Sequence, residues 1–423
     1  MTGDVLLVLI GDEVAGRLER GAADRLTFSY DERYRAQRDP VPLSVSMPVA
    51  VARHSGDAVA AWLWGLLPDD DRVLRRWAER FDVRARSPFG LLGAPVGRDC
   101  AGAVSFVRPE GLDDLAGGDG VTWLSDDDVA ARLRHLQQDT TGWLGADFTG
   151  RFSLAGAQAK TALLRADGRW GLPRGTQATT HILKPAVAGF DQHDLDEHLC
   201  LRSAALVGLD VVRTEVADFG DLRAVVVERY DRAGLPSGEP VRVHQEDVCQ
   251  SLGLHPSLKY QAEGGPRPSD VASLFRRVMP AAVAERAVWR FAQALAWNWV
   301  IAGTDAHAKN YSLLLGRGQV RFAPLYDIAS ALPYGHERDL RMAMKLGDDY
   351  RLHVQRPSTW AALGRDLRLP ADDLRAEAVR QAAAAPEAMA KAAGEVEHLH
   401  SAFASRLVEA VTARAARCAA MAG

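Results

Sequence analysis

The feature that most constrains this chain is an apolar helical stretch that ends in a short polar loop. Apolar residues recur at helical spacing from Trp289 to Val300, which predicts a buried helix. The loop that follows contains Asp305 and Asn310, five residues apart. Two polar oxygen-bearing side chains are therefore expected at the end of an otherwise apolar element.

A short β-hairpin is predicted directly after this loop. Two β-prone runs, 311–315 and 319–323, flank the three-residue turn Gly316-Arg317-Gly318. Such a hairpin returns the chain to Asp327, so that oxygen ligands at its two ends can lie side by side. Carboxylate and amide oxygens placed in this way suit Mg²⁺, with phosphate oxygens completing its coordination.

The order Asp305, Asn310, Asp327 is typical of phosphoryl transfer. In kinases a catalytic-loop Asp accepts the proton of the attacking hydroxyl, an Asn five residues later holds a metal ion, and a second Asp holds the metal that bridges the phosphates. Each residue alone is more often part of an Asx turn. Independent turn residues have no reason to reproduce both the order and the intervening hairpin, so the set favours a kinase-like centre.

Composition sets outer limits on the class of protein. The 423 residues are 47% hydrophobic and 25% charged, which indicates a globular chain with room for two or three domains. A net charge of −4 argues against direct DNA binding as the main task. The four cysteines form no C-x-x-C pair, which fits a reducing cytosol. The first apolar run, Val5 to Ile10, is too short for a signal or membrane segment. We expect a cytoplasmic protein without membrane contact.

Three segments are predicted along the chain. The first, residues 1–107, has expected strands at 4–10, 14–18, 26–30, 43–47 and 103–106 and expected helices at 59–66, 72–81 and 88–96. Gly, Pro and Asp replace apolar periodicity from Arg108 to Gly120, which marks a linker region, 108–150, with a helix beginning after Ser125. Residues 151–423 form the third segment, whose Ala- and Arg-rich helices after residue 371 are expected to break at Pro386.

A loop of small residues begins the third segment. Ser153 to Lys160 is not a P-loop, because Leu154 and Ala159 stand where that motif requires glycine. The backbone N–H groups around Gly156 can still approach phosphates closely. Further along, Lys184 ends a short apolar strand, which suits either a phosphate contact or ordinary exposure of the charge at a strand end. Glu228 to Tyr230 follow a buried strand, at the place where a two-lobed nucleotide cleft would seat adenine.

With these residues in view, the chain resembles the HipA family of serine/threonine kinase toxins over nearly its whole length. The motifs that carry the resemblance are Ser153-Leu-Ala-Gly-Ala-Gln-Ala-Lys160, Thr180-His-Ile-Leu-Lys184, Val227-Glu-Arg-Tyr-Asp-Arg232, His244-Gln-Glu-Asp247, Thr304-Asp-Ala-His-Ala-Lys-Asn310 and Pro324-Leu-Tyr-Asp-Ile328. The segments 43–48 and 97–103 similarly look like the family's N-terminal domain.

The resemblance implies a fold and a set of site residues. The fold is α/β (α+β), with a small β-rich N-terminal domain followed by a bilobal protein-kinase-like domain whose C-terminal lobe is helical. Asp305 is the implied catalytic base, Asn310 and Asp327 the Mg²⁺ ligands, and Ser153 a site of self-phosphorylation. The implied ATP contacts are Ala155, Gly156, Ala157, Gln158, Ala159, Lys160, Lys184, Glu228, Arg229, Tyr230, His307, Lys309, Asn310, Tyr326 and Asp327.

The resemblance also implies partners and leaves rival functions open. A HipB-like antitoxin would bind the protein and provide its contact with DNA, and the protein substrate would belong to translation, where aminoacyl-tRNA synthetases are known family substrates. A homodimer stays open. Thr304 replaces the Arg that precedes the catalytic Asp in ordinary kinases, and Tyr326-Asp327-Ile328 replaces D-F-G. A small-molecule phosphotransferase and a non-catalytic nucleotide-binding module are the alternatives.

Overall fold

The computed structural model describes residues 4–112, 120–186, 189, 191–234, 240–399 and 401–422. The chain divides into two compact units. Unit 1 comprises Met1–Pro185, Asp218–Ser257 and Ser312–Val320, and unit 2 comprises Ala186–Ala217, Leu258–Tyr311 and Arg321–Gly423. The domain limits at residues 107 and 150 stay a prediction, and part of the expected linker, 113–119, lies outside the described residues.

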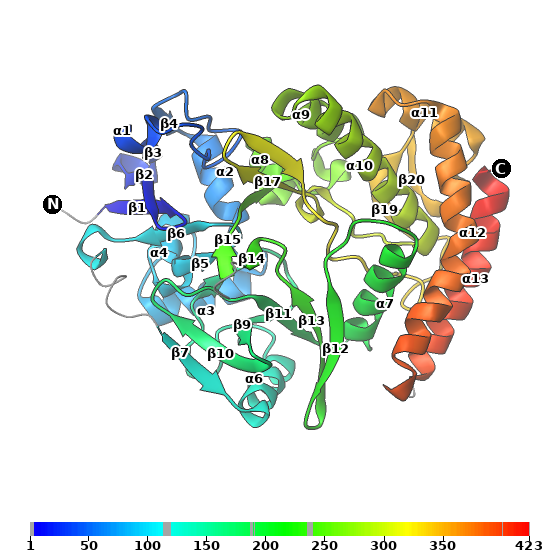
Figure 1. Cartoon of the computed structure of the whole chain (residues 1–423), viewed down its shortest axis with the longest axis horizontal. Coiled ribbons are helices and arrows are strands. Elements are labelled where there is room, and N and C mark those ends of the chain that lie inside the picture. Colours follow the sequence, from blue (N-terminus) through cyan, green and yellow to red (C-terminus); the bar gives the residue numbers. More distant parts are fainter. Residues whose placement is uncertain are drawn as a thin grey trace. The chain divides into compact units, whose positions relative to one another are not determined.

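Unit 1 begins with a five-stranded antiparallel sheet (Figure 1). Its order is β4-β3-β2-β1-β6, from β1 (Val5–Ile10), β2 (Glu13–Arg20), β3 (Leu26–Tyr30), β4 (Arg53–Ser55) and β6 (Val104–Val107). Every second residue of β3 is buried, as expected for a strand with one face on a core. The strands predicted at 4–10, 14–18, 26–30 and 103–106 are confirmed.

The strand predicted at residues 43–47 is wrong, because this segment is a turn. Ser44 and Met47 pair only with each other, as an isolated bridge. Tyr30 Oη donates to the Met47 carbonyl at 2.6 Å, and the Val45 N–H donates to Glu246 Oε1 at 2.9 Å. These tertiary partners satisfy backbone groups that a strand would have used, so local β-propensity is overridden.

Short helices stand between the strands of this sheet in the chain: α1 (Glu32–Arg35) precedes β4, and α2 (Asp57–Gly65), α3 (Asp71–Phe81) and α4 (Pro88–Leu92) precede β6. The predicted helices at 59–66 and 72–81 are confirmed. The helix predicted at 88–96 ends at Leu92, and Pro95 begins a separate 3₁₀ turn. Proline has no N–H to donate to the preceding turn, so the α-helix cannot continue through it without losing a bond.

A second, six-stranded sheet lies mainly in unit 1, although residues 214–217 of one of its strands belong to unit 2. Its order is β12-β13-β11-β9-β10-β7, from β7 (Gly120–Leu124), β9 (Thr161–Ala166), β10 (Arg169–Arg174), β11 (His181–Pro185), β12 (Thr214–Phe219) and β13 (Leu222–Glu228). Helix α6 (Asp126–Gln138) packs against β11 and β13. Ser125 caps it reciprocally with Asp128, as the sequence predicts.

Smaller strand pairs complete unit 1. Strand β5 (Asp99–Cys100) pairs with β8 (Phe152–Ser153), and β14 (Arg232–Gly234) pairs with β15 (Pro240–Arg242). A further strand, β16 (His244–Asp247), leads into α8 (Val248–Ser251). Strand β16 pairs with β17 (Ser312–Gly316), and β17 is followed by β18 (Gln319–Phe322) in the same sheet. The hairpin predicted after the polar loop is therefore confirmed.

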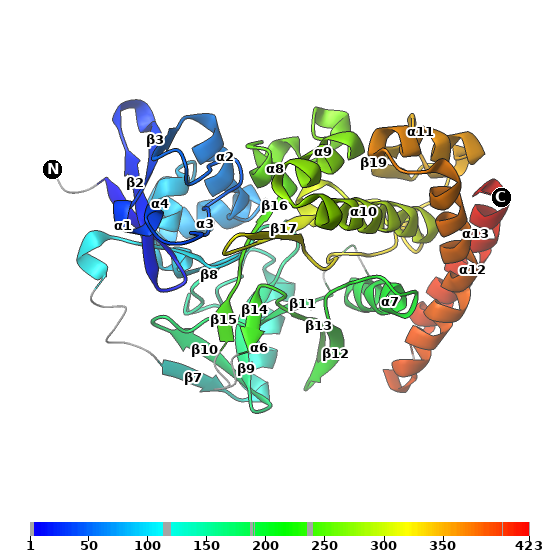
Figure 2. The ribbon, with the colours of Figure 1, turned by 45° about the horizontal axis from the view of Figure 1, so that its top comes forward.

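Unit 2 is mainly helical. It contains α7 (His193–Leu206), α9 (Pro268–Val278), α10 (Ala281–Ile301), α11 (Pro357–Leu367), α12 (Ala371–Glu395) and α13 (Ala402–Ala422), with the pair β19 (Arg341–Leu346) and β20 (Asp349–Arg351). Helix α10 packs against α9, α12 and α13, and α12 and α13 run side by side in Figures 1 and 2. Buried Arg414 of α13 donates two hydrogen bonds to the Trp299 carbonyl near the end of α10.

The expected break at Pro386 is wrong, because α12 runs through it without interruption. A proline inside a helix removes one backbone hydrogen bond and costs about 3 kcal/mol. The flanking residues Ala385, Ala388 and Met389 are buried, and α12 packs against α7, α10 and α13. This packing offsets the lost bond. No helix in the described part of the chain is both long and apolar enough to span a membrane.

Candidate active site

The polar loop of unit 2 begins at a tight helix end. Ala302 closes α10 in the left-handed region at φ +58°, and the Gly303 N–H donates to the Asn298 carbonyl at 2.7 Å. A Cβ on Gly303 would lie 2.2 Å from the side-chain oxygen of Asn298, so only glycine fits there. The chain therefore leaves the buried helix abruptly and presents Thr304 and Asp305 at the surface.

Asp305 is the most exposed acidic group of this loop, with 67% of its side chain accessible. Its Oδ1 accepts a hydrogen bond from the Tyr260 hydroxyl at 2.6 Å and lies 3.9 Å from His307 Nε2. Burial lowers the pKa of His307, so the imidazole is neutral at neutral pH and the contact is not an ion pair. Asp305 is thus an accessible carboxylate that is held from one side.

Asn310 is fixed by the same loop. Its side-chain Nδ2 donates to the Asp305 carbonyl oxygen at 2.7 Å, and its backbone N–H donates to the His307 carbonyl at 2.9 Å. This hydrogen bond uses the amide nitrogen and not the side-chain oxygen. That oxygen is the atom a hard cation would bind.

Asp327 lies in the segment after the hairpin. Backbone hydrogen bonds connect this segment to another part of unit 2. Leu325 donates to the Asp210 carbonyl and accepts from the Val212 N–H, both at 2.9 Å. Asp327 itself has φ +58°, a left-handed backbone conformation that residues other than glycine adopt uncommonly. Such strain persists where the surroundings impose it, and it occurs often at functional sites.

Asn310 and Asp327 line one small pocket of unit 2. Its other lining residues are Asn298, Ala306, Tyr311, Leu325, Tyr326 and Ile328. The Tyr326 hydroxyl also donates to the Lys309 carbonyl at 2.7 Å. This hydrogen bond connects the loop that contains Asn310 to the segment that contains Asp327. The structure therefore brings Asn310 and Asp327 to one pocket and places Asp305 on the same loop as Asn310.

The donor set of this pocket fits Mg²⁺ with a nucleotide. Its lining includes the Asp327 carboxylate and the side-chain amides of Asn298 and Asn310, whose oxygens are hard ligands, and no sulfur or imidazole. Across the described residues there is no group of three or more His, Cys, Asp or Glu side chains able to hold a metal. A cation here would therefore need phosphate oxygens to complete its coordination.

The small-residue loop predicted to cover phosphates lies in unit 1. Ser153 ends the short strand β8 and is fully buried, with its hydroxyl donating to the Leu66 carbonyl at 2.8 Å. The Gly156 carbonyl accepts from the Asp69 N–H at 3.0 Å. Lys160 folds back on the loop, donates to the Ala155 carbonyl at 2.6 Å and lies 4.9 Å from the centre of the Trp143 ring. Its ammonium braces the loop that contains it.

The other nucleotide contacts predicted for unit 1 fall on neighbouring strands. Lys184 is buried in β11 opposite Val225 of β13, and Glu228 ends β13. The backbone N–H of Arg229 donates to the Thr180 carbonyl, and its carbonyl accepts from the Arg232 N–H. These bonds use the Arg229 N–H and one lone pair of its carbonyl oxygen.

The Arg229 side chain belongs to a buried ionic cluster, which sequence reasoning missed. The cluster joins Asp99 and Asp231 to Arg229, Arg232 and Arg242. Burial acts to raise the pKa of the Asp99 carboxyl, but the three guanidinium groups outweigh it and hold that pKa below its usual value. Both aspartates are therefore charged, and the cluster carries an excess of positive charge.

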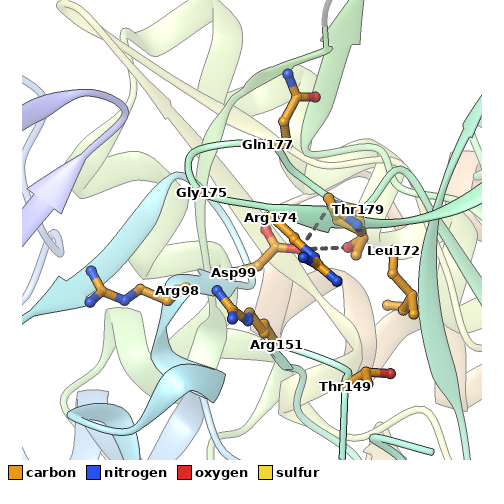
Figure 3. A pocket seen from close by; sticks show the side chains of 11 residues that line it. Arg98, Asp99, Thr149, Arg151, Leu172, Arg174, Gly175, Gln177 and Thr179 are labelled. Atoms are coloured by element: carbon orange, nitrogen blue, oxygen red, sulfur yellow. Dashed lines mark hydrogen bonds between the residues drawn. The ribbon is translucent and has the colours of Figure 1, made fainter. Parts of the chain in front are cut away.

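An arginine-lined pocket lies beside this cluster, entirely within unit 1. Arg98, Arg151 and Arg174 line it, and Figure 3 shows the Arg98 side chain pointing away from Asp99, whose carboxylate accepts from the Thr179 hydroxyl at 2.6 Å. Strand β8 pairs with β5 next to this place, with Phe152 opposite Asp99 and Ser153 opposite Cys100. The sequence did not predict this pocket as a site. The signal that it offered was Arg151, a basic residue two positions before Ser153.

The remaining predicted residues divide between the two units. His307 and Lys309 are buried in the unit 2 loop, while Ala155, Ala157, Gln158 and Ala159 belong to the unit 1 loop. Tyr260, which bonds to Asp305, was missed. It precedes Asp305 by 45 residues and stands in no recognisable motif. Only the folded chain reveals its contact.

Comparison with known families then identifies the fold. A model of the HipA-like C-terminal domain matches residues 152–399, and a model of the HipA N-terminal domain matches residues 6–107. The chain belongs to the HipA family. Within it, the putative kinase Y4mE of Sinorhizobium fredii is 33% identical over 98% of this chain and 98% of its own length.

A second relative and a solved structure extend this result. The serine/threonine-protein kinase toxin HipA of Shewanella oneidensis is 29% identical over 97% of this chain and 94% of its own. A structure of HipA from Shewanella oneidensis MR-1 with HipB and operator DNA superposes with a TM-score of 0.81 at 25% identity, over 98% of this chain and 96% of that one. The predicted fold class is confirmed, and family membership supports a protein kinase, which implies use of ATP.

Proposed function

We propose that this HipA-family chain is a serine/threonine protein kinase that uses ATP with Mg²⁺. The observation that carries the proposal is the unit 2 loop, where Asp305 is exposed and Asn310 and Asp327 line one pocket. An accessible carboxylate next to two hard oxygen ligands is the arrangement that phosphoryl transfer requires.

In the proposed reaction, Asp305 accepts the proton of a serine or threonine hydroxyl. The hydroxyl oxygen forms a bond to the γ-phosphorus as the bond from that phosphorus to the β,γ-bridging oxygen breaks, and ADP leaves. Asn310 and Asp327 would hold Mg²⁺, which when bound neutralises phosphate charge. The Tyr326 and Asn310 hydrogen bonds keep these ligands in place before the nucleotide arrives.

We assign the remaining nucleotide contacts to unit 1. Lys184 would neutralise phosphate, and its burial at the end of an apolar strand strengthens such a charge interaction. The backbone of the 155–160 loop would approach the phosphates, with Gly156 at φ +106° allowing a turn that other residues resist. Glu228 and Tyr230 would seat the adenine, while the Arg229 side chain keeps its structural role.

Self-phosphorylation at Ser153 is part of the proposal. The hydroxyl is fully buried and bonded to the Leu66 carbonyl, so β8 must open before transfer. A phosphate adds about −1.5 to −2 charges, which the buried position cannot accept. Arg151 and the pocket that it lines with Arg98 and Arg174 offer positive charge for the modified segment (Figure 3). The loop would then no longer be able to cover ATP.

We further propose a HipB-like antitoxin as partner and a protein of the translation machinery as substrate. The first rests on the Shewanella structure, in which HipA is bound with HipB and operator DNA. The net charge of −4 supports DNA contact through such a partner. An aminoacyl-tRNA synthetase is the substrate class to test first.

The role of Asp305 can be tested by one isosteric change. Asp305→Asn should keep ATP-dependent thermal stabilisation and lose about 10²- to 10⁴-fold in the rate of phosphate transfer, because the side chain keeps its shape but not its basicity. ADP formation and thermal unfolding with Mg²⁺-ATP measure the two effects. Asp339→Asn, at another exposed carboxylate of unit 2, is the control and should behave as wild type.

Two outcomes would count against the proposal. Transfer by Asp305→Asn within a few-fold of wild type would make Asp305 an ordinary loop residue. Stabilisation by ATP without any turnover in the wild type would indicate a nucleotide-binding regulatory module.

A further inference from the structure

Tyr260 lies in a tight turn that is tied to the polar loop of unit 2. Its carbonyl accepts from the N–H groups of Glu263 and Gly265, at 3.0 and 2.9 Å, which fixes the turn. The preceding carbonyl, of Lys259, accepts from the Ala308 N–H at 3.1 Å. The Tyr260 backbone therefore has a defined position relative to the segment that contains Asp305.

The Tyr260 side chain makes two contacts with that segment. The hydroxyl donates to Asp305 Oδ1 at 2.6 Å, a short bond of the kind formed to a charged acceptor. The ring packs edge to face with the His307 ring, with centroids 5.0 Å apart and an interplanar angle of 80°. His307 is buried, so it fixes the ring from the interior side while the hydroxyl reaches the surface.

The hydrogen bond from Tyr260 involves only one of the two carboxylate oxygens of Asp305. Asp305 Oδ1 takes the Tyr260 hydroxyl, and within the described residues Oδ2 accepts no hydrogen bond. An exposed aspartate on a loop would otherwise sample several rotamers. A bond that pins Oδ1 presents Oδ2 in one direction, which is what a base needs before it meets a hydroxyl.

We propose that Tyr260 is a positioning residue that orients the Asp305 carboxylate for proton transfer. The role rests on the kinase function proposed above and adds a residue outside the 304–310 and 324–328 motifs. Tyr260 acts through Asp305 and does not itself touch the reacting atoms. The opposite role would be a hydroxyl that occupies the place of the substrate and must be displaced from Asp305.

The change Tyr260→Phe separates these roles, because it removes the hydroxyl and keeps the ring on His307. Loss of a hydrogen bond to a charged group predicts a fall in kcat of about 10- to 100-fold, with KM for ATP within about twofold. Tyr350→Phe is the matched control, since within the described residues the Tyr350 hydroxyl forms no hydrogen bond. It should keep wild-type kcat, and both variants should unfold at similar temperatures.

A double variant tests whether Tyr260 works through Asp305. In an Asp305→Asn background, Tyr260→Phe should change the residual rate by less than about twofold, because no basic carboxylate remains to be oriented. An equal fall in both backgrounds would show a merely structural residue and overturn the proposal. Wild-type kcat in Tyr260→Phe would also overturn it, and a faster rate would indicate the displaced-hydroxyl role.

The proposed kinase function has its own separate outcome. A wild-type protein that transfers no phosphate refutes that function and this role together. Active wild type with unaffected Tyr260→Phe refutes this role alone.

Discussion

At the scale of the residue, Asp327 combines a carboxylate that lines the unit 2 pocket with an unfavourable backbone conformation. Its φ of +58° costs about 1–2 kcal/mol for a residue with a Cβ. Glycine would adopt this conformation freely but would remove the carboxylate from the pocket. Stability and the proposed cation binding therefore favour different residues at position 327. A substitution there can separate the two effects.

Asp327→Gly should leave the free energy of unfolding unchanged or raise it by up to about 1 kcal/mol, because the backbone strain is relieved. The same variant should lose the difference in thermal stabilisation between Mg²⁺-ATP and ATP with EDTA. Asp82→Gly is a matched control, since Asp82 also has positive φ, at +51°, where it ends α3. It should keep the Mg²⁺-dependent difference. A metal-dependent difference that survives in Asp327→Gly would remove Asp327 from the cation site.

Spacing in the sequence singled out the candidate site residues but not the residues that contact them. Asp305, Asn310 and Asp327 were predicted because one local unit, loop plus hairpin, holds them in a known order. Tyr260 and the Asp99 cluster depend on contacts between segments far apart in the chain. Nothing in local periodicity or motif spacing encodes such contacts.

At the scale of the element, Glu246 explains why one predicted strand is a turn. This residue of β16 is fully buried and accepts the Val45 N–H, so it satisfies the backbone that would otherwise pair in a sheet. Burial raises the pKa of Glu246 from 4.5 to about 7. The folded protein therefore binds a proton there that the unfolded chain releases at lower pH.

This shift predicts how stability depends on pH. A raised pKa of an acid gives stability that is fully present below pH 4.5 and is lost as pH rises towards 7. Glu246→Gln keeps an acceptor for Val45 without the charge, so it should match wild type near pH 4.5 and exceed it at pH 8 by on the order of 3 kcal/mol. Urea unfolding at the two pH values measures this, with exposed Glu409→Gln on α13 as control. A wild type as stable as Glu246→Gln at pH 8 would contradict the assignment.

At the scale of the whole molecule, the fold class was predictable and the division into units was not. Alternating and helical periodicities located strands such as β1, β2, β3 and β6 and helices such as α2, α3 and α10, since these patterns follow from burial on one face. The return of residues 312–320 to unit 1 depends on β17 pairing with β16, about 70 residues earlier in the chain. The uninterrupted helix at Pro386 likewise reflects tertiary packing that exceeds a local penalty.

The proposed transfer of phosphate from ATP to a protein hydroxyl, with Asp305 as base, can be followed on the protein itself. The most direct measurement is mass spectrometry of the intact protein after incubation with Mg²⁺-ATP, followed by peptide mapping, for wild type, Ser153→Ala and Asp305→Asn. We expect one added phosphate on Ser153 in wild type and none in either variant, with the modified wild type no longer stabilised by ATP. Absence of phosphate in the wild type, or equal phosphorylation of Asp305→Asn, would refute the proposed role of Asp305 as base.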